Sequence, residues 1–138
     1  MLSFNGNDFA QMESTSYVHD GVKLTEYENE PFIVGDYKHN KVEFLHSSHR
    51  MWYTATSFGN NEHTFDRIFG YAAVSRPGKT FILGGCCDQK KDRSTVIMFE
   101  NDEWKSLDRL KQGRINFMAI TYGTHVMMVG GSVQDNEW

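Results

Sequence analysis

The sequence contains little cysteine: its only two, Cys86 and Cys87, are adjacent. Neighbouring cysteines rarely pair with each other because the ring would be strained, and two thiols do not make a disulfide framework. This argues against a small secreted domain held together by disulfides. The sequence also lacks an Asn-x-Ser/Thr glycosylation acceptor. We therefore expect reduced thiols and a cytoplasmic protein, with an extracellular location as the alternative.

A strong charge of one sign and long apolar runs are also lacking. The 14 lysines and arginines stand against 18 aspartates and glutamates, and the basic cluster Lys90, Lys91 and Arg93 is only local. Nucleic-acid binding is therefore disfavoured. No apolar run approaches the ~20 residues of a transmembrane helix, and the N-terminus, 1–5, does not have the pattern of a signal peptide. We expect a protein partner, no nucleic acid and no membrane span.

Catalytic motifs are absent as well. The sequence has no Gly-x-Ser-x-Gly, no phosphate-binding glycine loop and no His-Glu-x-x-His, and its carboxylates are scattered. His46 and His49 have a spacing that could bind a metal, but a zinc site needs three or four protein ligands, and no partner is evident. We expect these to be surface histidines in a turn, and we expect no catalytic residue, no metal and no cofactor.

What the sequence does contain is a repeat. Three apolar residues precede Gly84-Gly85, and three apolar residues also precede Gly130-Gly131, which lies 46 residues later (130 − 84). A weaker copy has Gly35-Asp36, with an aspartate in place of the second glycine. A period in this range indicates one supersecondary unit copied along the chain.

Aromatic residues recur with the glycines. The step from Phe9 to Gly35 is 26 residues (35 − 9), and the step from Trp104 to Gly130 is the same (130 − 104). Trp52 occupies this aromatic position in the remaining copy, but its step to Gly84 is longer because a polar stretch, 57–64, intervenes. Length differences that are confined to polar loops are typical of a constant strand frame with variable connections.

Each unit is expected to hold four short strands. In the second complete unit a turn signal at 76–78 and another at 101–102 separate apolar runs, which suits an all-β sheet protein rather than helices. Phe44 is expected to correspond in the first complete unit to Phe99 in the second. The predicted strands of the second unit are Ile68–Ser75, Lys79–Gly84, Thr95–Glu100 and Trp104–Leu107.

The apolar run ending in two glycines, followed by a downstream aromatic residue and a tryptophan, resembles the kelch repeat. Arg67 and Arg114, which precede their glycine pairs by similar distances, strengthen the resemblance, whereas Asp36 departs from it. In that family each unit of about 50 residues builds one four-stranded blade of a β-propeller. The resemblance implies that the repeated glycines and the tryptophans Trp52 and Trp104 have a structural role.

The resemblance also implies a division of the chain into blades. We expect 1–13 to be the end of one blade, 14–58 and 59–110 to be two further blades, and 111–138 to be the first half of another. Propellers usually have four to eight blades, so about three blades' worth of sequence would form an incomplete ring. We expect a fragment of a longer propeller, or a piece that is completed by further blades or by another chain.

Two of the connecting loops, 57–64 and 86–94, are longer than their counterparts. In a four-stranded blade the loop between the second and third strands and the loop to the next blade leave the same face. We predict that this face binds a ligand, because binding residues collect on loops carried by a rigid frame. The predicted contacts are Asn60, Asn61, His63, Asp88, Lys90, Lys91 and Arg93.

The function that the resemblance implies is that of a protein-interaction module and not of an enzyme. One alternative is a propeller-borne enzyme resembling a copper oxidase, for which Tyr37, Cys86, Cys87 and His125 would supply the residue types without a matching motif. The other alternative is an extracellular adhesion or carbohydrate-binding propeller. Fold alone does not decide among these functions.

Overall fold

The protein is described by a computed structural model over residues 2–35, 41–57, 68–86 and 93–133. Every regular element within these ranges is a β-strand, and the same ranges contain no helix. Among these residues there is accordingly no helix long and apolar enough to cross a membrane. The all-β class that the repeat predicts is confirmed.

Two antiparallel sheets of four strands form the centre of the molecule, and in each the strands pair in chain order. The first sheet comprises β3 (Lys23–Tyr27), β4 (Glu30–Val34), β5 (Val42–His46) and β6 (Met51–Ala55). The second sheet comprises β7 (Ala72–Arg76), β8 (Lys79–Leu83), β9 (Val96–Glu100) and β10 (Glu103–Ser106).

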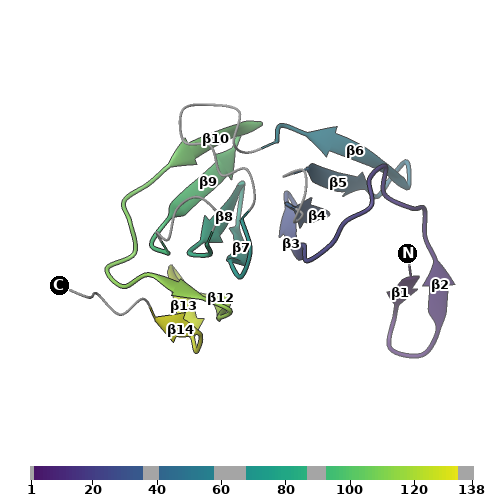
Figure 1. The fold of residues 1–138 in the computed structure, drawn as a ribbon. Helices are drawn as coiled ribbons and strands as arrows, with labels where there is room; N and C mark the ends of the chain where they lie inside the picture. The colour runs from purple at the N-terminus through teal and green to yellow at the C-terminus, as the bar shows by residue number, and fades with distance from the viewer. Residues whose placement is uncertain (1, 36–40, 58–67, 87–92, 134–138) are drawn as a thin grey trace.

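Smaller strand pairs flank the two sheets. On the N-terminal side these are β1 (Leu2–Phe4) and β2 (Phe9–Gln11). On the C-terminal side β12 (Met118–Tyr122) pairs with β13 (His125–Val129), and β11 (Arg114–Ile115) pairs with β14 (Ser132–Val133). The sheets follow one another along an open arc that does not close into a ring (Figure 1).

The four strands predicted for the second unit are all present; the first begins four residues later than expected and the third one residue later. β7 starts at Ala72 rather than Ile68, because Phe69 and Tyr71 make hydrogen bonds outside the pairing of β7 with β8. Phe69 forms an isolated bridge with Cys86, and the Tyr71 hydroxyl donates a hydrogen bond to the carbonyl oxygen of Val34 in the first sheet at 2.6 Å. This segment therefore ties the second sheet to the first instead of extending β7.

A hydrophobic core lies between the two sheets. Because side chains alternate along a strand, Phe32 and Val34 face the second sheet while Ile33 faces the opposite way. The second sheet contributes Ile82, Ile97 and Phe99 to the shared core. Burying a side chain of this size typically contributes ~1.5–3 kcal/mol, so contact between the sheets is a major part of the stability of each.

Tryptophans make the same contact twice. The indole N–H of Trp104 donates to the carbonyl oxygen of Thr56, just after the last strand of the first sheet, at 2.6 Å. The indole N–H of Trp52 donates in the same way to Glu13, just after β2, at 3.2 Å. Phe9, the aromatic residue at this repeat position in the first copy, has no side-chain N–H to donate and is 70% exposed. Each indole thus combines apolar packing with one hydrogen bond to the segment that follows the preceding sheet or strand pair.

The glycine pairs are sites of close backbone approach. Gly84 and Gly85 both have positive φ, 60° and 86°. A Cβ at Gly84 would lie 2.5 Å from the carbonyl oxygen of Arg114, and one at Gly131 would lie 2.6 Å from that of Ile115. Only glycine fits such positions without displacing backbone.

One predicted correspondence is wrong by a single residue. Trp104 pairs with Phe99 across β9 and β10, whereas Trp52 pairs with Leu45, not Phe44, across β5 and β6. A shift of one residue moves a side chain to the other face of a strand. Phe44 therefore packs on the face of the first sheet that is turned toward the second, beside a cavity between them.

The other face of the first sheet buries a charged residue. The Glu43 side chain is fully buried beside the cluster that contains Leu45 and Trp52. Its carboxylate accepts hydrogen bonds from the backbone N–H groups of Ser16, at 2.9 Å, and Tyr17, at 3.3 Å. It also lies 2.6 Å from His19 Nε2. The segment before β3 thereby supplies the polar partners that a buried carboxylate requires.

Candidate functional site

The predicted loop face is described only at its edge. Of the predicted contacts, only Arg93 belongs to the described residues. The others lie outside them: Asn60, Asn61, His63, Asp88, Lys90 and Lys91.

Arg93 stands where the long loop between β8 and β9 returns to the sheet. Its carbonyl oxygen accepts a hydrogen bond from the N–H of Arg114 at 2.9 Å, and that of Ser94 accepts one from Leu110 at 2.8 Å. A Cβ at Gly113 would lie 2.8 Å from the carbonyl carbon of Arg93. The backbone at this end of the loop is therefore held against the following strand pair.

A cavity lies between the two sheets, mainly at the strand ends away from the β8–β9 loop. It has a volume of about 630 Å³ and is formed by the turn from β3 to β4, the adjoining parts of β5 and β6, and the turn from β9 to β10. We call it the inter-sheet pocket. Its lining residues are Tyr27, Glu28, Glu30, Phe32, Phe44, His46, Tyr53, Thr54, Ala55, Phe99 and Asp102.

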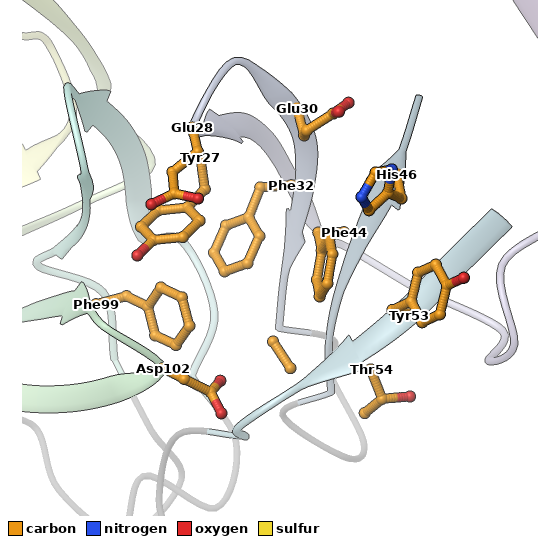
Figure 2. A pocket seen from close by; sticks show the side chains of 11 residues that line it. Tyr27, Glu28, Glu30, Phe32, Phe44, His46, Tyr53, Thr54, Phe99 and Asp102 are labelled. Carbon is orange, nitrogen blue, oxygen red and sulfur yellow. The ribbon is translucent and has the colours of Figure 1, made fainter. Parts of the chain in front are cut away.

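Aromatic rings form the inner wall of the inter-sheet pocket. Tyr27 lies with its ring centroid 5.0 Å from that of Phe99 in an edge-to-face arrangement, and Phe32 lies 5.1 Å from Phe99. Phe44 stacks on Tyr53 at 5.6 Å. Figure 2 shows the rings of Tyr27, Phe32, Phe44 and Phe99 gathered in the middle of the view, between the acidic side chains Glu28 and Asp102.

Two tight turns place acidic side chains at the mouth of this pocket. Glu28 and Asn29 both have positive φ, 53° and 65°, and so do Asn101 and Asp102, 52° and 58°. Positive φ at both central residues is typical of the hairpin turns that match the twist of antiparallel strands. The N–H of Asn101 donates to the Tyr27 hydroxyl at 3.2 Å, so the two turns are linked across the sheets.

The third acidic residue, Glu30, is held by its own sheet. Its carboxylate accepts hydrogen bonds from the backbone N–H of Ser47, at 3.1 Å, and from the Ser47 hydroxyl, at 2.7 Å. These bonds to Ser47 lower the pKa of Glu30, and the nearby His46 acts in the same direction. Glu30 is thus ionised at neutral pH.

The two histidines of the His-x-x-His spacing lie beside this pocket. Their rings stack with centroids 4.5 Å apart, and His46, which is half-buried, lines the cavity, whereas His49 is exposed in the turn. The Ser48 hydroxyl lies 2.9 Å from His46 Nδ1. Within the described ranges no group of three or more histidine, cysteine, aspartate or glutamate side chains could hold a metal ion.

Of the residue types considered for a copper site, Cys86 and His125 are described and Tyr37 and Cys87 are not. Cys86 exchanges two backbone hydrogen bonds with Phe69, both at 2.9 Å, and His125 is exposed at the start of β13. The described part of the chain gives no arrangement in which these two residues share a ligand.

Sequence reasoning missed the inter-sheet pocket. Two of its acidic residues, Glu28 and Asp102, lie in short turns, and its tyrosines and phenylalanines come from five strands of two sheets, so no local motif joins them. The available signals were the turn pairs Glu28-Asn29 and Asn101-Asp102 and the apolar strand position of Phe44, which was matched to the wrong residue.

The sequence of this chain is similar to those of known proteins. No family model matches the chain. It is 27% identical over 112 residues to Kelch-like protein 40 of Xenopus laevis, covering 78% of this chain and 18% of that protein. It is 30% identical over 71 residues to Kelch-like protein 41a of Danio rerio, covering 50% of this chain and 12% of that protein. The chain spans less than a fifth of the length of either relative.

These likenesses agree with the repeated four-stranded sheets. The likenesses and the strand order of the two sheets support a kelch-repeat β-propeller fold for this chain. Each of the two four-stranded sheets has the strand number and the antiparallel order of one kelch blade. The inter-sheet pocket is then a space between two neighbouring sheets, lined mainly by the strand ends away from the β8–β9 loop, together with Thr54 and Ala55 at the end of β6.

Proposed function

We propose that this chain is a protein-interaction module of a kelch propeller and binds a protein partner through the loop face around 57–64 and 86–94. The observation that carries the proposal is the anchoring of Arg93. Its backbone is bonded to the next strand pair, so this end of the long β8–β9 loop is presented on a rigid frame. Loops held in this way are where binding residues concentrate.

The chemistry of the loop face supports a partner that carries negative charge. Arg93 belongs to the same loop as Lys90 and Lys91, and Arg114 stands one hydrogen bond away from it. The Nε atoms of Arg93 and Arg114 are buried and have no hydrogen-bond partner among the described residues. Arginine is well suited to carboxylate recognition because its planar donors fit both oxygens.

The experiment compares the proteins captured by the wild-type chain and by a variant with Lys90, Lys91 and Arg93 all changed to alanine, quantified by mass spectrometry. We expect the variant to lose the specifically captured partner. The control is Lys105→Ala on β10, which removes an exposed lysine away from this face. Equal capture by the wild-type chain and the triple variant would contradict the proposal.

We further propose that a further blade, from this chain or another, covers the outer face of β12 and β13. At corresponding positions of the second sheet Ala72, Val74 and Leu83 are buried in a cluster with residues of this strand pair. On β12 and β13 themselves Met118 and Ile120 are 78% and 63% exposed. Exposed apolar faces of this kind mark interaction surfaces. Light scattering should show association that Ile120→Glu abolishes, and a monodisperse monomer would exclude completion by a second copy.

A cytoplasmic location is part of the same proposal, because two adjacent cysteines without a disulfide framework suit a reducing compartment. Fractionation of cells that express the protein tests this. Recovery from the secreted fraction would favour the adhesion or carbohydrate-binding alternative.

A further inference from the structure

The inter-sheet pocket has the charge and the walls of a site for a cation. Three of its lining residues are carboxylates, Glu28, Glu30 and Asp102, and none is lysine or arginine. The rest of the wall is largely aromatic. Ring faces attract cations through their quadrupole, and carboxylates at the rim add direct charge attraction.

The negative charge in this pocket is not neutralised by the chain itself. In the described part of the structure no lysine or arginine pairs with any of the three carboxylates. Asp102 Oδ1 accepts one hydrogen bond, from the N–H of Thr56 at 3.1 Å, and the Glu28 carboxylate has no partner among the described residues. Each carboxylate therefore has lone pairs available for a ligand.

In the second sheet the charges at the corresponding positions neutralise each other. The negative charge is therefore particular to this pocket and does not come with the repeated fold. Strand pairing makes Glu30 and His46 of the first sheet correspond to Lys79 and Glu100 of the second. In the second sheet these two side chains neutralise each other, with Lys79 Nζ 3.1 Å from Glu100 Oε1. In the first sheet the corresponding place keeps the Glu30 carboxylate, whose hydrogen bonds within the described ranges come from Ser47.

The shape of the pocket suits a planar cation presented by a protein. Its volume of about 630 Å³ is within the range of ligand sites, so a side chain of a partner can enter it. The rim residues Glu28, Tyr53 and Asp102 are exposed, so a partner segment can reach it. A guanidinium group can stack on an aromatic face and at the same time donate two parallel hydrogen bonds to a carboxylate.

We propose that the inter-sheet pocket binds an arginine side chain of a partner protein segment, with the guanidinium group between the aromatic wall and the carboxylates of Glu28 and Asp102. This site is distinct from the loop face, because no described residue that lines the pocket is among the predicted contacts of the loop face. Failure of either proposal therefore leaves the other standing.

The test uses the whole 138-residue chain and blocked peptides, followed by NMR titration of the backbone amides. The probe is a glycine-flanked arginine peptide, and the matched probe carries citrulline, which has the same shape without the charge. We expect the arginine peptide to shift the amides of the two turns, 28–29 and 101–102, and the citrulline peptide to bind at least about tenfold more weakly. Equal binding of the two peptides, or no binding of the arginine peptide at millimolar concentration, would overturn the proposal.

Variants locate the binding within the pocket. The double change Glu28→Gln and Asp102→Asn keeps the size of both side chains, and asparagine tolerates the positive φ at 102. We expect this double variant to bind the arginine peptide at least about tenfold more weakly. The control Glu103→Gln removes an exposed carboxylate next to Asp102 but outside the lining, and it should bind normally. Equal losses of affinity for the arginine peptide in the double variant and in the control would mean that net charge alone causes the effect. That result would overturn the proposed site.

A lysine peptide tests the choice of cation. Lysine carries a compact charge with no planar donor pair, so it should bind more weakly than arginine by at least about threefold. Lysine binding as tightly as arginine would overturn the assignment to a guanidinium group.

Discussion

The two complete sheets share their topology but differ in what they bury at corresponding positions. Strand pairing makes Glu43 of β5 correspond to Ile97 of β9, and His19, before β3, to Ile68, before β7. In the second sheet both residues are buried and apolar; in the first they are a buried glutamate and a histidine 2.6 Å apart. The fold thus accepts an apolar pair or a polar pair at one place, provided that both members change together.

The apolar pair and the polar pair need different surroundings. An apolar pair needs only packing, which Ile68 and Ile97 find in the core between the sheets. A buried carboxylate needs hydrogen-bond donors, and Glu43 obtains two of them from the backbone of 16–17. Breaking such a pair usually costs more than replacing the whole pair. The polar pair therefore makes the first sheet depend on the segment that precedes it.

The largest expected effect is that of Glu43→Ile, which places the residue of the second sheet into the first. The buried His19 side chain and the N–H groups of Ser16 and Tyr17 would lose their acceptor. Loss of one partner of such a group costs about 3–5 kcal/mol. Urea unfolding should show this loss, whereas the control Glu103→Ile, at an exposed position, should change the free energy of unfolding by no more than ~0.5 kcal/mol.

The next effect is a rescue. Adding His19→Ile to Glu43→Ile reproduces the apolar pair of the second sheet and removes the orphaned imidazole. We expect the double variant to be more stable than Glu43→Ile alone, with a coupling energy of about 1–3 kcal/mol between the two positions. The N–H groups of Ser16 and Tyr17 still lack an acceptor, so recovery should be incomplete. Additive effects in a double-mutant cycle would show that the two side chains do not act as a pair.

A smaller loss of stability is expected when the indole hydrogen bond that Trp104 and Trp52 each make is removed. Trp104→Phe keeps an aromatic ring but removes the indole N–H that donates to Thr56. The net contribution of one such bond is about 0.5–1.5 kcal/mol, and we expect a loss of this size in urea unfolding. Trp52→Phe removes the corresponding bond to Glu13 and should cost a similar amount. A loss in only one variant would mean that the two bonds are not equivalent.

The smallest effects lie at the charged strand ends, and they appear in titrations rather than in unfolding. Hydrogen bonds from Ser47 lower the pKa of Glu30, and a hydrogen bond and charge attraction from Lys79 lower that of Glu100. A carboxyl group with a lowered pKa stabilises the folded state above its unfolded pKa, and this contribution disappears as the pH falls through the folded pKa.

We expect Ser47→Ala to raise the pKa of Glu30 and Lys79→Gln to raise that of Glu100, each without changing the other. Carboxyl carbon shifts in NMR titrations measure both values. Lys41→Gln, which changes a lysine that interacts with Tyr17 instead, serves as the control. An unchanged pKa of Glu30 in Ser47→Ala would show that Ser47 does not cause its shift.

Much of the strand layout could be predicted, because its signals are local. Glycine pairs after apolar runs and the turn at 76–78 mark where strands end, and the four predicted strands of the second unit are observed, with shifts of one residue at the ends of β8, β9 and β10 and a start four residues later for β7. The error at Phe44 shows the limit of such reasoning. A match by distance from a glycine depends on loop length, whereas the partner across the sheet, Trp52 with Leu45, decides the face.

Glu43 and the inter-sheet pocket could not be predicted in the same way. Glu43 stands in the middle of an apolar strand, and its hydrogen-bond donors lie 26 and 27 residues earlier in the chain. The pocket joins turns that are 74 residues apart, as the bond from Asn101 to Tyr27 shows. Neither the Glu43 hydrogen bonds nor the pocket corresponds to a short sequence motif.

The order of the residues alone determined that this is a repeated β-structure with strands ending at glycines, because backbone conformation and strand alternation depend on near neighbours along the chain. Only the tertiary structure decided which sheet faces meet, which carboxylate is buried with its partners and where a cavity with acidic walls remains. These depend on contacts between residues far apart in the sequence, and two sheets of the same topology resolve them differently because their side chains differ.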